Sequence, residues 1–240
     1  MKIEVWSDYA CPFCYIGKER LGTALEQFEH RQDIEVVYKS FELDPQAPRE
    51  VDHDVHDMLS AKYGMSREQA IQMNRNLARQ AEDTGLTFQF DTMKLTNTFD
   101  AHRLTQYAAQ QGKMDKIAEE LFRAYFTDSQ HLGDHDTLLD LAERIGLDRQ
   151  ATAKMLEGDD FATQVRTDED EARQLGITSV PFFVIDRKYA VSGAQSTDTF
   201  LQAVQKAWSE SSRPLQVLGS EQPGTKDDAA NCQDGSCSIE

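Results

Sequence analysis

Alternating apolar and polar residues at the start of the chain predict a strand at residues 2–6 (KIEVW). A second strand, rich in β-branched residues, is expected at 34–43 (IEVVYKSFEL). Between the two, apolar residues recur at nearly helical spacing, at Ile16, Leu21, Leu25 and Phe28. A strand, a helix and a strand within about forty residues form a βαβ unit with parallel strands.

The middle of the chain changes character after DPQAPRE, whose two prolines end the second strand. No convincing strand follows before about residue 175, and helical signals repeat instead. Ser66 with Gln69 matches a capping box, and residues 114–126 carry apolar side chains at the i, i+3, i+4, i+7 spacing. We therefore predict a helical block of about 120 residues inside the chain.

Strand signals return near the end of the chain. Residues 180–185 and 189–191 are predicted strands around an Asp-Arg-Lys turn, with Pro181 at the strand entry, where its missing N–H does least harm. A closing helix is expected at 199–208. The full pattern is βαβ, helical insert and ββα. From residue 214 the composition is polar without periodicity, which favours disorder or loose docking.

Charge and composition exclude several classes of partner. The formal net charge is −17 over 240 residues, so the chain repels phosphate backbones and we expect no nucleic-acid partner. No basic stretch suits anionic lipid and no window approaches the ~20 apolar residues that span a bilayer, so no membrane partner is expected. The start, MKIEVWSDYACP, lacks the apolar run and cleavage site of a secretory signal, and the expected location is the cytoplasm.

Cys11 and Cys14 form the motif CPFC, which follows the first strand and opens the first helix. Pro12 suits the first helical turn, and the unpaired N–H groups and positive dipole there favour a thiolate at Cys11. Cys14, one turn further along, can then resolve a mixed disulfide. The alternatives are two core thiols or half of a zinc site, completed by the distant tail cysteines or by His53 and His56. These two histidines stand in VDHDVHD, which we interpret instead as a solvated helix start beside acids. A strand before the motif, within a βαβ unit, favours the redox interpretation, and we expect no metal and no cofactor.

The chain resembles the thioredoxin-like DsbA family, and within it the cytoplasmic FrnE-type oxidoreductases. The resemblance rests on DYACPFCYIGKERL, on NTFDAHRL and on GITSVPFFVID with VSGAQ, and it covers nearly the whole chain. It implies an α/β thioredoxin fold formed by residues 1–45 and 176–213. A large all-helical domain would be inserted at 46–175, and a flexible tail would follow at 214–240.

The resemblance also implies roles at matched positions. Cys11 would attack the substrate, Cys14 would resolve the intermediate, and Pro181 would be a cis-proline facing the motif. The backbone of Val180 would then be exposed to pair with an extended substrate segment. The implied partners are protein disulfides and a low-molecular-weight or protein thiol reductant. The implied task is reduction or isomerisation of protein disulfides, with chaperone activity of the helical block as an accessory role.

The chain departs from the family pattern in places. A His lies between the cysteines of DsbA itself, whereas Pro12 and Phe13 stand here, so we expect a less strongly activated Cys11 than in the strongest oxidants. Val5 occupies the position where thioredoxin relatives bury an acid. Asp8 is a nearby substitute proton acceptor, unless it serves only the loop.

Related glutathione-using enzymes remain the alternative function. The 2-hydroxychromene-2-carboxylate isomerases and kappa-class glutathione transferases share this architecture but have Ser in place of Cys11. Gln195 and Ser196 lie where those relatives bind the γ-glutamyl end, although the local sequence differs. His102 is interpreted as a cleft, surface or core histidine, and Asn97 as the cap of a helix starting near Thr98.

Cys232 and Cys237 stand in the tail motif NCQDGSC, whose Asp-Gly turn can bring the two sulfurs together. FrnE-type relatives include proteins with such a second motif. The alternatives are incidental thiols or a weak metal clip. About 18 residues separate Pro214 from Cys232, and a flexible chain of that length spans roughly 20–25 Å. We therefore predict that this second dithiol relays electrons to or from CPFC, or protects it.

Overall fold

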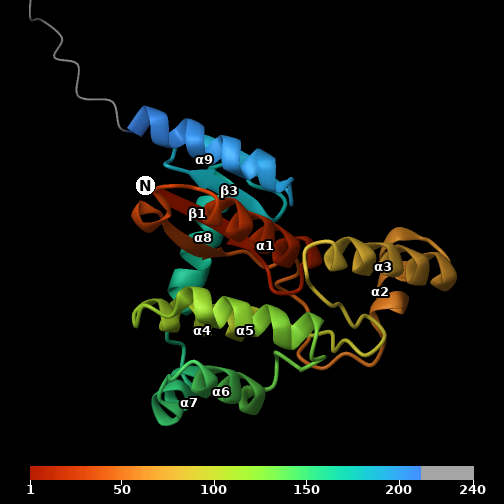
Figure 1. Ribbon diagram of the computed structural model, residues 1–240. Coiled ribbons are helices and arrows are strands. Elements are labelled where there is room, and N and C mark those ends of the chain that lie inside the picture. Colours follow the sequence, from red (N-terminus) through yellow and green to blue (C-terminus); the bar gives the residue numbers. More distant parts are fainter. Residues whose placement is uncertain (212–240) are drawn as a thin grey trace, which may run out of the picture.

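The computed structural model describes residues 1–211, and Cys232 and Cys237 lie outside the described residues (Figure 1). A four-stranded sheet in the order β2-β1-β3-β4 forms one half of the molecule. β1 pairs parallel with β2 and antiparallel with β3, which confirms the predicted βαβ start and the later ββ hairpin. The elements of this half are β1 (Lys2–Ser7), α1 (Pro12–Glu26), η1 (Arg31–Asp33), β2 (Glu35–Ser40), β3 (Phe182–Ile185), β4 (Tyr189–Ser192) and α9 (Thr197–Ser211).

All the described elements between β2 and β3 are helices, as the sequence predicted. They are α2 (Val55–Tyr63), α3 (Arg67–Glu82), α4 (Phe99–Ala109), α5 (Met114–Phe126), α6 (His135–Arg144), α7 (Arg149–Glu157) and α8 (Ala162–Gln174). At the N-caps of several of these helices, a side-chain oxygen accepts hydrogen bonds from backbone amides of the first turn. The predicted capping box of Ser66 and Gln69 is present at α3. The fold class expected from the sequence is confirmed: an α/β thioredoxin fold with helices inserted between its two halves.

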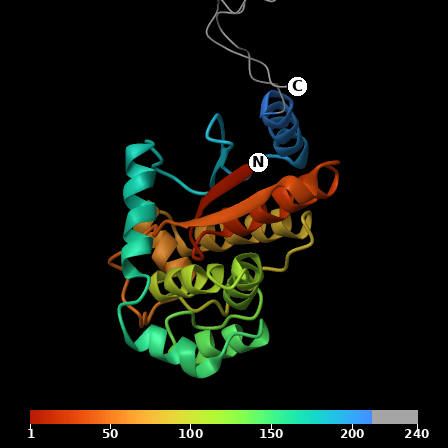
Figure 2. The ribbon, with the colours of Figure 1, turned by 90° about the vertical axis from the view of Figure 1, so that its left-hand side faces the viewer.

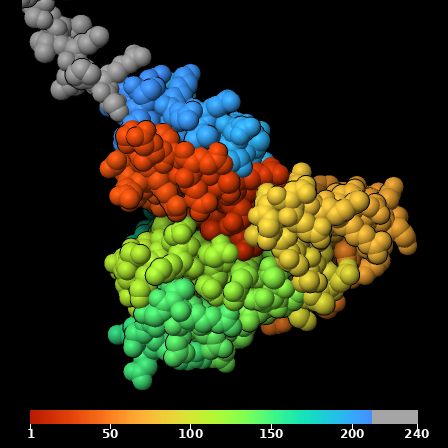
Figure 3. Space-filling model, in the orientation of Figure 1, coloured from red at the N-terminus to blue at the C-terminus, as the bar shows by residue number. Residues whose placement is uncertain are grey.

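The helices are arranged in layers. α1 and α9 pack against each other beside the sheet, and α4 and α5 lie between this half and α6 with α7 (Figures 1 and 2). α8 covers the other face of the sheet, where Trp6, Ala172, Ile177 and Val184 form a small separate core. α2 and α3 form a hairpin that protrudes from the body (Figure 3).

Two predicted strands are shorter in the structure. The second ends at Ser40 because the chain then leaves the sheet: Leu43 N–H donates to the Asp8 carboxylate (2.7 Å), and Glu42 N–H donates to Glu169 (3.2 Å). The third begins at Phe182 instead of residue 180, since Pro181 has no N–H to offer the ladder.

Arg103 fastens the inserted helices to one another. Its guanidinium is buried and donates to the carbonyls of Met155 (2.6 Å) and Asp160 (2.8 Å), and to the carboxylate of Asp100 (2.8 Å). The last carbonyls of a helix have no partner within it, so this side chain satisfies the end of α7 from α4.

Candidate active site

The CPFC motif lies where β1 turns into α1. Cys11 has extended backbone angles and is the N-cap, and Pro12 is the first helical residue, as predicted. The turn is closed by the Cys11 amide, which donates to the Asp8 carbonyl at 3.0 Å. The motif therefore follows the carboxyl end of β1, a central strand of the sheet.

The two cysteines are reduced, and both are buried. The Cys11 thiol donates to the carbonyl of Val180 at 3.6 Å, and its sulfur accepts no hydrogen bond from the first amides of α1. The expected stabilisation of a Cys11 thiolate by these amides is therefore not formed in this reduced, thiol-bearing arrangement.

The Val180–Pro181 peptide bond is cis, as the resemblance implied, and it faces the start of α1. Gly17 permits this approach, because a Cβ there would lie 3.1 Å from the Phe183 ring and 3.2 Å from the Pro181 ring. Phe182 pairs with Trp6 across the sheet, which fixes β3 in register with the strand that leads to the motif. The structure thus brings Cys11, Val180 and Pro181 together from opposite ends of the chain.

Cys14 sits one turn deeper, packed in the core. Burial raises the pKa of its thiol well above the ordinary value, and the adjacent Cys11 raises it further. Hydrogen bonds from the Asp8 backbone and the Ser7 side chain act in the opposite direction. Cys14 is therefore a protonated thiol at neutral pH.

Asp8 lies under the motif with its carboxylate buried. The carboxylate accepts hydrogen bonds from Thr98 Oγ1 (2.7 Å), Leu43 N (2.7 Å) and Ala10 N (3.2 Å). His102 of α4, which is also buried, places Nε2 3.4 Å from Oδ1, but that nitrogen has no hydrogen bond. The sequence indicated neither arrangement directly, because the partners come from positions far apart along the chain.

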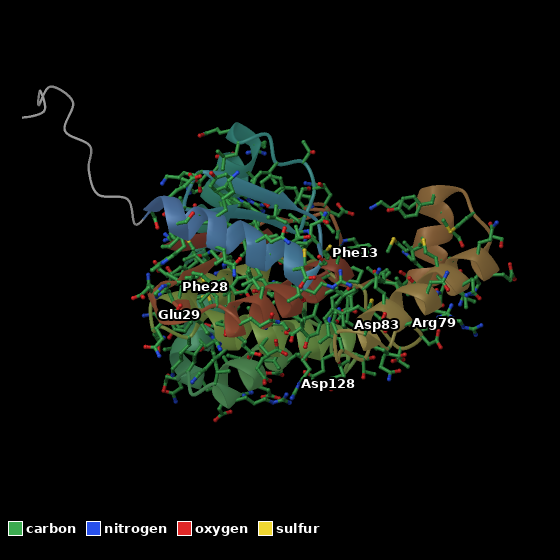
Figure 4. The ribbon with its side chains drawn as sticks, turned by 45° about the horizontal axis from the view of Figure 1, so that its top comes forward. Phe13, Phe28, Glu29, Arg79, Asp83 and Asp128 are labelled. Carbon is green, nitrogen blue, oxygen red and sulfur yellow. The ribbon has the colours of Figure 1, made fainter. Side chains whose placement is uncertain are left out.

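Phe13 is the exposed member of the motif. Its side chain is 45% exposed, and it lies at the edge of the body on the side of the α2–α3 hairpin (Figure 4). Tyr15 points the other way, donates to Glu119 of α5 at 2.7 Å and so ties α1 to the inserted helices. The motif thus carries one exposed apolar side chain, Phe13, while Tyr15 anchors α1 from the buried side.

The structure shows the contacts of several residues whose roles the sequence left open. His56 is buried and not part of a solvated helix start, because its ring nitrogens contact Asp91 (2.9 Å) and Asn74 (3.1 Å). Thr98, not Asn97, is the N-cap of α4, although Asn97 Oδ1 accepts from the Phe99 amide at 2.8 Å. Within residues 1–211, no group of three or more His, Cys, Asp or Glu side chains is placed to hold a metal.

Gln195 and Ser196 lie between β4 and α9. Gln195 donates to the Ser192 carbonyl at 2.8 Å, and Ser196 Oγ accepts from the Thr199 amide at 3.2 Å. Ser196 also borders an open pocket of about 490 Å³ between α1, the end of α3 and the start of α9, with Arg20 and Asp83 among its lining residues.

Comparisons with known proteins agree with this geometry. A family model for the DSBA-like thioredoxin domain matches residues 2–205. The crystal structure of a probable DsbA oxidoreductase from Streptomyces coelicolor is 43% identical, with a TM-score of 0.85 over 93% of this chain and 96% of that one.

Two more distant structures share the fold. They are a 2-hydroxychromene-2-carboxylate isomerase (14% identity, TM-score 0.66, 88% of this chain and 98% of that one) and the cytosolic disulfide reductase DsbM from Pseudomonas aeruginosa (14%, 0.57, 88% and 96%). No helix within residues 1–211 has the length and apolar character needed to cross a bilayer. With the reduced CxxC pair beside a cis-proline and a family match along almost the whole described chain, the protein belongs to the DsbA-like thioredoxin-domain family of thiol oxidoreductases.

Proposed function

We propose that the protein is a cytoplasmic thiol–disulfide oxidoreductase that reduces or isomerises protein disulfides through Cys11 and Cys14. The observation that carries the proposal is the Cys11 sulfur at the start of α1, 3.6 Å from the carbonyl before the cis-proline. The cytosolic disulfide reductase that shares this fold supports the reductive direction and the location.

The exchange proceeds in two steps. The Cys11 thiolate attacks one sulfur of the substrate disulfide, forms a mixed disulfide and releases the other substrate sulfur as a thiolate, which takes a proton. The Cys14 thiolate then attacks the Cys11 sulfur, so that a Cys11–Cys14 disulfide forms and the substrate leaves fully reduced. A low-molecular-weight or protein thiol returns two electrons to the pair.

Substrate presentation would use the backbone beside the cis-proline. Val180 precedes β3 and its carbonyl already faces the Cys11 sulfur, so an extended segment around a substrate cysteine can pair with it. Phe13, between the two cysteines, offers an exposed apolar contact. The protein would thus accept unfolded or extended chains more readily than compact ones.

The test is reduction of insulin by dithiothreitol in the presence of wild type, Cys11→Ser and Cys14→Ser. Wild type should accelerate precipitation of the insulin B chain, and Cys11→Ser should not. Cys14→Ser should accumulate a mixed disulfide with insulin that a non-reducing gel and mass spectrometry detect. An active Cys11→Ser variant would refute the proposal.

A glutathione-dependent transferase or isomerase is the second candidate, because Ser196 and Arg20 border a pocket beside α1. The distinguishing assay is conjugation of glutathione to a chromogenic electrophile by wild type and by Cys11→Ser. Conjugation that survives in Cys11→Ser, together with no insulin reduction by wild type, would favour this function.

We extend the proposal to the tail pair and to accessory chaperone activity. Cys232 and Cys237, outside the described residues, would exchange with Cys11, and alkylation with mass spectrometry along a redox titration tests this. If Cys232 and Cys237 never form a disulfide with each other or with Cys11, the proposed exchange is refuted. For the chaperone role, a double Cys11→Ser, Cys14→Ser variant should still prevent aggregation of an unfolded protein.

A further inference from the structure

Three arginines differ from all the others within residues 1–211. Every other arginine in this part of the chain forms an ion pair with a carboxylate, whereas Arg20, Arg75 and Arg79 form none. The protein has a formal net charge of −17, so carboxylates are abundant and an arginine without one needs an explanation. A guanidinium matches carboxylate and phosphate groups with two parallel hydrogen bonds. The three arginines are therefore candidates for holding an anionic partner.

All three arginines border pockets beside α3. Arg20 lines the open pocket of about 490 Å³ between α1, the end of α3 and the start of α9. Arg75 and Arg79 line a second open pocket of about 430 Å³ on α3 itself. The two pockets adjoin at the end of this helix, where Glu82 borders the second pocket and Asp83 the first.

Arg20 is poorly placed to hold an anion. Its guanidinium already donates to the Ala194 carbonyl at 2.6 Å. Three acids also line its pocket, namely Glu19, Asp83 and Asp198. Like charges repel, so an anionic segment avoids this pocket.

Arg75 and Arg79, which we call the arginine face, are better placed. They stand four positions apart and so lie one above the other on an exposed side of α3. Arg79 donates to the neutral side chain of Asn76, and Glu82 is the one acid that lines their pocket. Figure 4 shows Arg79 on the same side of the molecule as Phe13, the exposed residue of CPFC. The arginine face therefore offers positive charge on the side of the motif.

The chain itself contains an acidic segment that carries a dithiol. Around Cys232 and Cys237 the sequence reads KDDAANCQDGSC, with Asp227, Asp228 and Asp234 against a single lysine. This segment lies outside the described residues. Its charge is opposite to that of the arginine face, and such complementarity steers and orients docking.

The length of the chain also fits. α9 begins at Thr197, beside the first pocket, and ends at Ser211, about 20 Å further along its axis. Asp227 follows 16 positions after Ser211, and a flexible chain of 16 residues spans roughly 22 Å. The acids can therefore return along α9 to the pockets beside α3. Asp228 stands four positions before Cys232, and four extended residues reach about 14 Å further.

We propose that the arginine face, Arg75 and Arg79 of α3, docks the acidic segment 227–234 of the chain's own tail and thereby holds the tail dithiol beside Cys11. The inference rests on the proposed exchange between the tail pair and Cys11, and it adds the surface that guides this exchange. Docking raises the local concentration of the tail thiols at the motif, so exchange within one molecule outruns exchange with free thiols.

The guided exchange balances in atoms and electrons. After a substrate has been reduced, Cys11 and Cys14 form a disulfide. One tail thiolate attacks the Cys11 sulfur, and Cys14 leaves as a thiolate that takes a proton. The other tail thiolate then attacks its neighbour in this mixed disulfide, so that a Cys232–Cys237 disulfide forms and Cys11 is released reduced. Two electrons pass from the tail to the motif, and a low-molecular-weight or protein thiol returns them to the tail.

The experiment measures how strongly the arginine face favours a disulfide between Cys11 and Cys232. The full-length variant Cys14→Ser, Cys237→Ser retains only these two cysteines. It is equilibrated with mixtures of reduced and oxidised glutathione at low ionic strength. Alkylation with mass spectrometry reads the fraction that carries the Cys11–Cys232 disulfide, and the glutathione concentrations convert this fraction into the effective concentration of Cys232 at Cys11.

In this background, Arg75→Glu with Arg79→Glu should lower the effective concentration about fivefold, the loss expected for two exposed ion pairs. High salt should lower the effective concentration of the unsubstituted background by a similar factor, because it screens exposed charges. Asp227→Arg with Asp228→Arg should have the same effect. Combining the two double substitutions should restore most of the lost effective concentration, because each altered side chain again meets an opposite charge.

The matched control is Lys116→Glu with Lys154→Glu. These exposed lysines of α5 and α7 form no ion pair within residues 1–211, and their substitution changes the net charge by the same amount. The control should leave the effective concentration unchanged. Circular dichroism checks that each variant folds. If the substitutions on α3 prevent folding, the tail variant, whose changes lie outside the described residues, decides together with the salt dependence.

The failures of the two proposals can be told apart. If no Cys11–Cys232 disulfide forms in the background variant, the proposed exchange fails and the inference fails with it, whereas insulin reduction by wild type is judged separately. If the disulfide forms but the substitutions of Arg75 and Arg79 lower its effective concentration no more than the control does, the inference alone is overturned. A combined variant that restores nothing overturns it as well. An unchanged effective concentration with a raised KM for insulin assigns the arginine face to the substrate, which also overturns the inference.

Discussion

Cys11 and Cys14 stand one helical turn apart but face different surroundings. Cys11 contacts a backbone carbonyl at the start of the helix, whereas Cys14 packs in the core with a raised pKa. The proposed division of labour agrees with this difference: Cys11, the slightly more exposed thiol, would meet the substrate, and the deeper Cys14 would resolve the intermediate. The small thiolate fraction of Cys14 at neutral pH should then limit the rate of the second step.

We predict that resolution of a mixed disulfide accelerates with pH across the neutral range. Only the thiolate attacks, and with the pKa of Cys14 raised by burial the thiolate fraction should grow about tenfold per pH unit between about pH 6 and 8. Cys11 is labelled with 5-thio-2-nitrobenzoate, and release of this chromophore is followed by stopped-flow absorbance. A rate that levels off below about pH 8.5, the value for a free thiol, would contradict the burial argument.

At the scale of elements, α1 approaches β3 closely at one residue, Gly17. Gly17 faces Phe183 and Pro181 on this contact, whereas Gly22 of the same helix has nothing within 4 Å of the Cβ it lacks. The two glycines therefore separate the effect of close packing from that of helix propensity. Gly17 serves the approach of the cis-proline, and Gly22 does not.

We predict opposite effects of alanine at these two positions. Gly22→Ala should raise the free energy of unfolding by about 1 kcal/mol, because alanine has a higher helix propensity than glycine and its methyl group meets no neighbour at this position. Gly17→Ala gains the same helix propensity, but its methyl group crowds Phe183 and Pro181. This variant should therefore lower the free energy of unfolding by about 1 kcal/mol net. Urea denaturation followed by circular dichroism measures both values, and equal effects of the two variants would refute the packing argument.

The sequence predicted some elements well and others only in part. CPFC, the capping box at Ser66 and the periodicity of α5 are local patterns, and the structure bears them out. The cluster around Asp8 was not predictable, because its donors Leu43 and Thr98 lie 35 and 90 positions away. His56 was misjudged for the same reason, since its partners Asn74 and Asp91 come from beyond its own helix.

At the scale of the whole molecule, buried tyrosines gather around the motif and the inserted helices. Burial raises the pKa values of Tyr9, Tyr15, Tyr38 and Tyr125, and nearby carboxylates add to the effect. Below the ordinary tyrosine value of about 10, both the folded and the unfolded protein keep these protons and stability is complete. Above it, the unfolded chain ionises and the folded one resists, so stability is lost as pH rises.

We therefore predict that the free energy of unfolding falls as the pH increases above about 10, by up to about 1.4 kcal/mol per pH unit for each fully buried tyrosine. Denaturation in urea at a series of pH values measures the slope. Tyr125→Phe removes one of these groups and should flatten the decline by one such contribution. A variant with the wild-type slope would show that burial at this position does not carry the effect.

The division of the sheet between the two ends of the chain has a consequence for biosynthesis. β1 and β2 emerge early, but Ile3 pairs with Ile185, so β1 must wait for about 180 further residues. At about 5–20 residues per second, translation leaves the two thiols without Val180 and Pro181 beside them for roughly ten seconds or longer. The nascent chain therefore contains Cys11 and Cys14 before it contains the segment that completes the site. The inserted helices are synthesised while Val180 and Pro181 do not yet cover the two thiols.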